Sequence, residues 1–122
     1  MNSLDKLKLC AGFAHEKKAQ NLVALDVREQ SAFTSYFIIC SGGSTRQVQA
    51  IADHVELMMK GSGLLPLGAE GRQNGRWILL DYEDVIMHVF HEDERAFYDL
   101  EHLWHSSPRV DCDDPDEPGH RP

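Results

Sequence analysis

Three carboxylates lie close together between two apolar runs of the segment GRWILLDYEDVIMHVF, residues 75–90. Asp81 and Glu83 are two positions apart, and Asp84 follows directly. Carboxylate oxygens are the protein ligands that Mg²⁺ prefers. Asp81 and Glu83 could therefore hold a metal ion for phosphoryl chemistry, provided that a second segment binds the phosphate.

The candidate phosphate-binding segment is SGGSTRQV, residues 41–48, which follows an apolar run and opens an amphipathic stretch. A helix N-terminus at this position could bind an anion, and a Gly-Ser turn before paired carboxylates is similar to nucleotidyltransferases. However, the segment is neither GxGxxG nor GK[ST], and Asp81 comes about forty residues after the turn, beyond the spacing of those enzymes. A strand-to-helix turn capped by Ser44 is the simpler interpretation, and we do not expect an enzyme.

The charge of the chain limits its partners. The 122 residues include 12 basic and 20 acidic side chains, for a net charge of −8. Nucleic-acid affinity depends on Lys and Arg that neutralise phosphates, and the chain has no basic run, so we expect no direct nucleic-acid binding. An acidic surface favours encounter with a basic protein instead.

The remaining composition points to a cytoplasmic protein without a cofactor. The longest apolar runs have about five residues, too few to span a membrane, and the N-terminus does not read as a secretory signal. The cysteines, at positions 10, 40 and 112, include no CxxC pair, which favours a reducing compartment. We expect no membrane contact, metal or cofactor.

Hydrophobic periodicity predicts one α/β domain over residues 1–105, with a small mixed sheet of about five strands covered by helices. Residues 106–122 are rich in proline and acids and poor in apolar residues, which predicts a disordered acidic tail. The predicted helices are 4–19, 45–60 and 92–104, and the predicted strands are 22–27, 35–40, 64–69, 77–80 and 85–90.

The segment at 75–90 reads as a β-hairpin with a two-residue loop at Glu83 and Asp84. This register places Leu79 opposite His88 and Trp77 opposite Phe90. One face is then apolar and predicted to be core: Ile78, Leu80, Tyr82, Val85, Met87 and Val89. The other face mixes aromatic, charged and aliphatic side chains: Trp77, Leu79, Asp81, Ile86, His88 and Phe90. Such a face suits either a protein-binding surface or a core covered by a helix.

Three blocks of the chain, residues 35–55, 70–90 and 95–104, resemble the ribosomal silencing factor family, also called the Iojap family, and the match runs over residues 4–105. The resemblance implies an α/β fold similar to nucleotidyltransferases but without catalytic residues. It further implies binding to the large ribosomal subunit through its fourteenth protein, where this blocks joining of the small subunit and represses translation during starvation. The resemblance also implies a homodimer off the ribosome.

Two alternatives stay open beside this function. Related organellar proteins often act in ribosome assembly, so a large-subunit assembly factor without an inhibitory role is one of them. The other is a nucleotidyltransferase-like enzyme that uses Asp81, Glu83 and Mg²⁺.

The resemblance also implies a set of site residues. The family's tryptophan, its Asp-Tyr-x-Asp turn and its following histidine match this chain, and a glutamate precedes them; the predicted ribosomal-protein interface is thus Glu70, Trp77, Asp81, Tyr82, Asp84 and His88. Two positions depart from the family. Glu83 replaces a usual Gly, which predicts a longer or differently shaped turn. Ser35 replaces a usual Asp, which predicts that a contact there is weakened.

Overall fold

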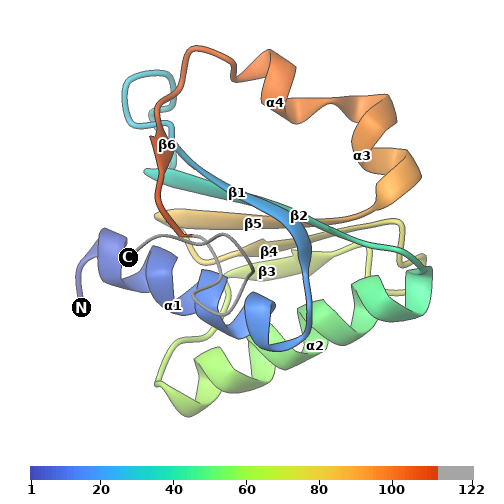
Figure 1. The fold of residues 1–122 in the computed structure, drawn as a ribbon. Coiled ribbons are helices and arrows are strands. Elements are labelled where there is room, and N and C mark those ends of the chain that lie inside the picture. Colours follow the sequence, from blue (N-terminus) through green and yellow to red (C-terminus); the bar gives the residue numbers. More distant parts are fainter. Residues whose placement is uncertain (113–122) are drawn as a thin grey trace.

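A computed structural model of the protein describes residues 1–112 and shows a central sheet with helices on both faces (Figure 1). The predicted α/β class is confirmed. In chain order the elements are α1 (Ser3–Glu16), β1 (Gln20–Asp26), β2 (Tyr36–Gly42), α2 (Thr45–Gly61), β3 (Gly68–Glu70), β4 (Trp77–Asp81), β5 (Val85–His91), α3 (Glu92–Tyr98), α4 (Leu100–Leu103) and β6 (Arg109–Val110).

The sheet is mixed, and its strand order is β3-β4-β5-β2-β1-β6. The two central strands, β2 and β5, pair in parallel, and every other pair is antiparallel. All seven residues of β2 are buried, because helices cover both faces of this strand. The continuous apolar run YFIIC is the pattern that such a strand requires.

The sheet has six strands in place of the predicted five, because β6 lies in the segment predicted to be disordered. Val110 pairs with Ala24 and Arg109 with Leu25, and the Val110 side chain packs against the core. Backbone hydrogen bonds to β1 therefore order a segment whose composition alone does not predict a strand. Disorder from residue 106 is wrong for this part of the tail, and residues 113–122 lie outside the described residues.

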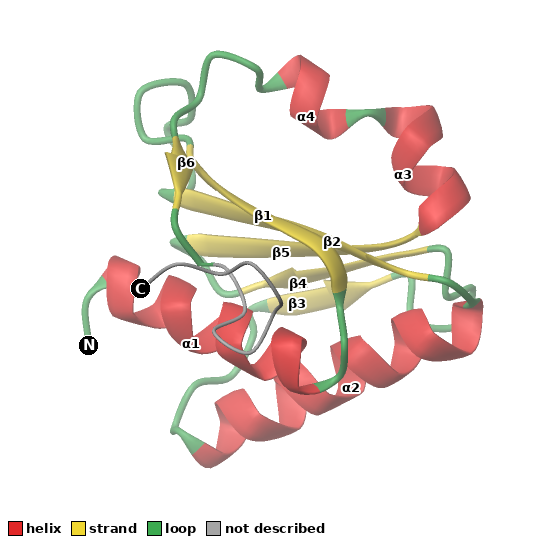
Figure 2. Cartoon of the chain, viewed as in Figure 1, coloured by secondary structure: helices red, strands yellow, loops and turns green. Residues whose placement is uncertain are grey.

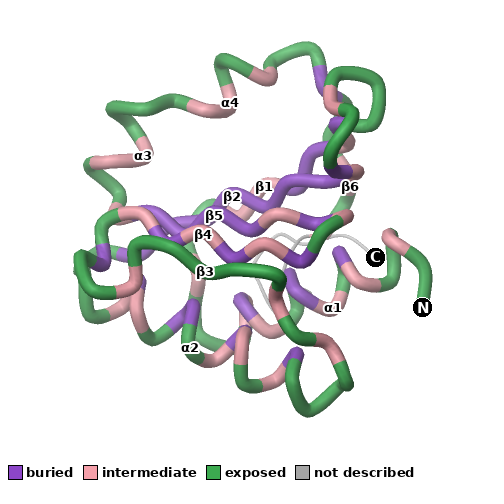
Figure 3. Tube along the Cα trace, turned by 180° about the vertical axis from the view of Figure 1, so that it is seen from behind, coloured by how far each residue is buried: buried purple, intermediate pink, exposed green. Residues whose placement is uncertain are grey.

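The helices form two unequal layers, with α1 and α2 against one face of the sheet and α3 and α4 over the other (Figure 2). The main core lies under α2, whose inward residues are Val48, Ile51, Ala52, Val55 and Met59. Ser44 begins this helix by accepting a hydrogen bond from the Gln47 amide at 3.1 Å, so the predicted cap is confirmed. The buried residues lie on the central strands and on the inward sides of α1 and α2, whereas the residues of α3 and α4 are half-buried or exposed (Figure 3).

The predicted helix over residues 92–104 is in fact two short helices. Asp99 separates them with φ +47°, a left-handed conformation that Asp tolerates better than most residues. Neither α3 nor α4 contains a buried residue, so core packing does not favour a single continuous helix. We call residues 92–103 the α3–α4 arm.

Candidate functional site

The hairpin of β4 and β5 has the predicted register. Trp77 pairs with Phe90 and Leu79 with His88, and the Tyr82 amide donates to the Val85 carbonyl at 2.9 Å. Two residues, Glu83 and Asp84, therefore close the turn. The alternation of apolar and polar residues fixed this register, because a slip by one residue would expose the core face.

The turn keeps its short form even though it contains Glu83. The Asp84 amide donates to the Tyr82 carbonyl at 3.0 Å, and Glu83 has φ +75°, which together describe a γ-turn with positive φ. Oδ1 of Asp81 accepts a hydrogen bond from the Glu83 amide at 2.8 Å. The turn is therefore not longer than usual, but it is differently shaped, which is the second form that the prediction allowed. The side chain of Asp81 supports a strained Glu83 in the position that suits glycine.

Asp84 connects the hairpin turn to the first helix. Its carboxylate accepts hydrogen bonds from Lys6 Nζ at 2.5 Å and from the Ser3 hydroxyl, and its carbonyl accepts from the Ser35 and Tyr36 amides. Burial opposes ionisation of this carboxyl, but the Lys6 and Ser3 hydrogen bonds outweigh it and lower its pKa. These contacts give Asp84 a structural role.

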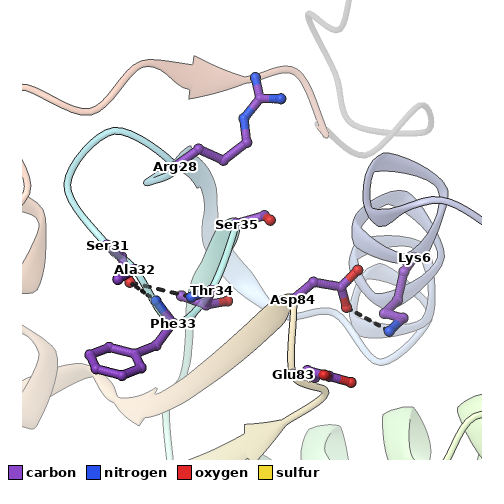
Figure 4. Close-up of a pocket in the computed structure, with 9 residues that line it drawn as sticks. All are labelled: Lys6, Arg28, Ser31, Ala32, Phe33, Thr34, Ser35, Glu83 and Asp84. Atoms are coloured by element: carbon purple, nitrogen blue, oxygen red, sulfur yellow. Dashed lines mark hydrogen bonds and ion pairs between the residues drawn. The ribbon is translucent and has the colours of Figure 1, made fainter.

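A cleft of about 490 Å³ lies beside this turn (Figure 4). It lies between the turn, α1 and the loop that joins β1 to β2, and Ser35 is among its lining residues. Both cations that line it already have partners, since Lys6 pairs with Asp84 and Arg28 with Asp26. The cleft therefore presents no free cation for an anionic ligand.

Tyr82 is separated from the other predicted interface residues. Its side chain is 3% exposed and belongs to the core cluster under α1 and α2, as the hairpin alternation predicts. Burial raises the pKa of its phenol, and the hydroxyl has no hydrogen-bond partner within residues 1–112. Tyr82 supports the hairpin from inside and does not lie on the face that carries Trp77.

The opposite face of the hairpin brings Trp77, Asp81 and Glu70 together. Glu70 pairs with Leu79 across β3 and β4, so the two side chains share this face with His88, which is opposite Leu79 on β5. Glu70 is exposed and Asp81 is half-buried. Neither carboxylate forms an ion pair in the described part of the chain.

Gly71 sets the position of the loop between β3 and β4. A Cβ atom there would lie 1.9 Å from the Trp77 carbonyl oxygen, and the residue has φ +85°. Gln49 on α2 donates to the Arg72 carbonyl at 2.9 Å and holds the same loop. Glycine thus allows the loop to pack directly on the backbone of Trp77 and keeps Glu70 beside it.

Trp77 is half-buried in an aromatic group. Its ring stacks on Phe90 at 4.8 Å between centroids, and the Tyr98 ring of the α3–α4 arm lies at the same distance. Tyr98 could not be assigned to the site from the sequence, because only the fold brings the arm over the hairpin. Tyr98 is 47% exposed, and we define the hairpin patch as Glu70, Trp77, Leu79, Asp81 and Tyr98.

His88 lies beneath this patch. The side chain of His88 is 6% exposed, and its Nδ1 atom accepts a hydrogen bond from Trp77 Nε1 at 3.1 Å. Burial lowers the pKa of His88 to about 4, so the imidazole is neutral near pH 7. This face of the hairpin is therefore in part a core covered by the arm and in part an open surface. Both predicted uses of its mixed composition, a helix-covered core and a surface open to a partner, are present.

The arrangement does not form a metal or phosphate site within residues 1–112. No group of three or more His, Cys, Asp or Glu side chains could hold a metal ion there, and Asp81 is hydrogen-bonded to the turn. At the start of α2, the Gly43 amide donates to Gln47 Oε1 at 2.8 Å, and the Gln47 amide donates to Ser44. The geometry supports a contact surface, and no described helix is long and apolar enough to cross a membrane.

Known proteins match this chain over almost its whole length. A family model described as "Ribosomal silencing factor during starvation" matches residues 1–121. The ribosomal silencing factor of Bacillus subtilis is 42% identical over 113 residues, which cover 93% of this chain and 96% of that protein. A mouse protein named "Mitochondrial assembly of ribosomal large subunit protein 1" is 25% identical, with 80% of this chain and 44% of its own length covered.

Structural comparison agrees with the sequence comparison. A crystal structure of a protein from Chromobacterium violaceum superimposes with a TM-score of 0.85 and 30% identity, covering 97% of this chain and 98% of that one. A protein of known structure therefore has a similar overall fold. The chain belongs to the ribosomal silencing factor family.

Proposed function

We propose that this protein binds the large ribosomal subunit in the cytoplasm, through the subunit's fourteenth protein, and thereby blocks association with the small subunit. Translation is then repressed when nutrients are short. The observation that carries the proposal is the hairpin patch, in which a half-buried Trp77 shares one face of the sheet with the carboxylates of Glu70 and Asp81, which form no ion pair within residues 1–112. Membership of the family supplies the kind of partner.

The composition of the patch suits a basic protein partner. Tryptophan and tyrosine are frequent anchors in protein interfaces, because they bury a large area with little loss of side-chain freedom. Unpaired carboxylates near such an anchor attract a basic surface and fix its orientation. The net charge of −8 adds a long-range attraction to the same basic partner.

The proposed mechanism requires no bond to be made or broken. A protein of this size, bound where the small subunit must dock, excludes the small subunit by its volume. Inhibition should therefore follow occupancy of the large subunit, and the protein acts stoichiometrically with it.

A subunit-joining assay tests this function directly. Purified large and small subunits are mixed with increasing amounts of the protein, and joined ribosomes are measured by light scattering and gradient sedimentation. We expect joining to fall in proportion to the fraction of large subunits that carry the protein. Full joining on saturated large subunits would contradict the proposed function.

A second candidate function is assembly of the large subunit without inhibition, which the name of the mouse relative favours. The same patch would serve either role, since both need contact with the large subunit. Binding that leaves joining unaffected, together with accumulation of large-subunit precursors in a deletion strain, would favour assembly.

We also propose that the free protein forms a homodimer. The α3–α4 arm exposes two large apolar side chains, Phe97 at 80% and Leu103 at 71%, and the Phe97 ring contacts Tyr98 of the hairpin patch. Analytical ultracentrifugation of the wild type and of Phe97→Ser with Leu103→Ser tests this, and we expect the double variant to sediment as a monomer.

A further inference from the structure

We propose that His88 acts through Trp77, as a positioning residue that fixes the orientation of the indole for the partner, and does not itself contact the partner. This inference rests on the proposed function of the hairpin patch. It changes the role of His88 from a contact residue to a residue that sets the shape of the contact surface.

The burial of His88 excludes a large direct contact. Only 6% of the residue is exposed, and its ring is enclosed by three aromatic neighbours: Phe37 at 5.1 Å, Trp77 at 5.9 Å and Phe90 at 6.1 Å between centroids. A rigid partner that touches Trp77 would reach little of the imidazole. What His88 offers to the surface is therefore its effect on Trp77.

The hydrogen bond between the two residues selects one orientation of the indole. Trp77 Nε1 is the single polar atom of its side chain, and it donates to His88 Nδ1 at 3.1 Å. The ring of Phe90, which stacks on the indole, and the ring of Tyr98, which is tilted against it, would accommodate the indole in more than one orientation, because such contacts are weakly directional. Only the acceptor at position 88 distinguishes the two edges of the indole. It binds the edge that carries the nitrogen, so the opposite, all-carbon edge points away from His88.

The surroundings of Nε2, the other ring nitrogen, indicate that a histidine at position 88 does not serve to stabilise the fold. Since Nδ1 accepts from Trp77, the neutral ring carries its proton on Nε2, and this buried atom has no hydrogen-bond partner in the described part of the chain. An unpaired buried N–H costs at least as much as one hydrogen bond contributes net. A leucine would pack here without that cost, so the feature that histidine adds is the acceptor for Trp77.

Two variants separate positioning from packing. His88→Leu keeps an apolar side chain but removes the acceptor, whereas His88→Asn restores an acceptor oxygen close to the place of Nδ1. We expect His88→Leu to bind large subunits about tenfold more weakly in co-sedimentation, without loss of thermal stability. His88→Asn should recover most of the affinity.

The orientation itself is measured in the free protein. In ¹⁵N-labelled protein the two indole N–H signals belong to Trp77 and Trp104 and are assigned with Trp77→Phe. We expect the Trp77 signal to exchange slowly with solvent in the wild type and His88→Asn, and quickly in His88→Leu. This readout does not depend on the ribosome and so reports on the inference even if the proposed function fails.

A double-variant test completes the experiment. Phenylalanine at position 77 keeps an aromatic ring but has no donor, so His88→Leu should cause no further loss of affinity in a Trp77→Phe background. Slow exchange of the Trp77 N–H in His88→Leu, equal affinity of His88→Leu and the wild type, or an additive loss in the double variant would each overturn the inference. A wild type that does not bind large subunits would instead reject the proposed function.

Discussion

Lys6 on the first helix and Asp84 at the hairpin turn form an ion pair with 2.5 Å between Nζ and Oδ1. The same ammonium donates to the Tyr82 carbonyl at 3.2 Å. One lysine thus holds both ends of the two-residue turn against α1, and the conformation of the turn depends on a residue far away in the sequence.

We predict that Asp84→Asn destabilises the protein by about 2 kcal/mol, since a partly buried ammonium loses a charged acceptor. Urea denaturation measures this change. The matched control is Arg76→Gln, which removes an exposed ion pair with Glu94 and should cost less than about 0.5 kcal/mol. Equal effects of the two variants would contradict the structural role of Asp84.

Trp77→Ala should weaken binding to large subunits about thirtyfold, which corresponds to loss of an anchor of about 2 kcal/mol. Leu57→Ala is the control, because Leu57 is 65% exposed on α2, on the other side of the sheet. Co-sedimentation at several protein concentrations gives both affinities. Similar affinities of the two variants would show that the anchor lies elsewhere.

Glu70→Lys should slow association with large subunits about fivefold at low salt and less at high salt, because rim charges act mainly on the association rate. Asp5→Lys makes the same change of net charge on α1, away from the hairpin patch. Stopped-flow measurements at two salt concentrations compare them. If both variants slow association equally, the net charge matters and the position of Glu70 does not.

Glu83→Gly should stabilise the protein by about 1 kcal/mol, because glycine adopts φ +75° without steric conflict. Glu83→Ala removes the same carboxylate but keeps a Cβ atom, so it should give no such gain. Thermal denaturation of the two variants separates backbone strain from charge. A stabilised alanine variant would assign the effect to the charge instead.

The free energy of unfolding should decrease when the pH is lowered through the range in which His88 titrates. The pKa of His88 is lowered from 6.5 to about 4 by burial, so between these values the unfolded state binds more protons than the folded state. Protonation of His88 therefore costs no stability above pH 6.5, and it lowers the free energy of unfolding progressively as the pH falls to about 4, by up to about 3 kcal/mol.

His88→Leu provides the control for this pH dependence. Its free energy of unfolding should vary less than that of the wild type between pH 4.5 and 7, as measured by urea denaturation at each pH. Parallel pH profiles of the two proteins would show that His88 titrates normally in the folded state.

Much of the fold follows from the sequence, because strong local patterns determine it. The alternation in WILLDYEDVIMHVF determines the hairpin register, and it already places Tyr82 in the core with Ile78 and Leu80. Assigning Tyr82 to the interface gave the family motif precedence over this alternation. The burial observed for Tyr82 agrees with the alternation.

Other features could not be predicted, because distant contacts determine them. A two-residue strand such as β6 has no periodicity to detect and becomes visible only when β1 lies beside it. The break at Asp99 interrupts a pattern that is helical on both sides. Likewise, Tyr98 joins the hairpin patch and His88 lies beneath it only once the arm has folded over β4 and β5.

The parallel pairing of β2 with β5 has a consequence for folding of the protein during its synthesis. Tyr36 pairs with Val85 and Gly42 with His91, so the most buried strand acquires its central neighbour only after most of the chain has been synthesised. Until then, the edge of YFIIC is open to association with other nascent chains. We expect protease-resistant structure to appear abruptly, late in elongation, when the second half of the sheet leaves the exit tunnel of the ribosome that makes it.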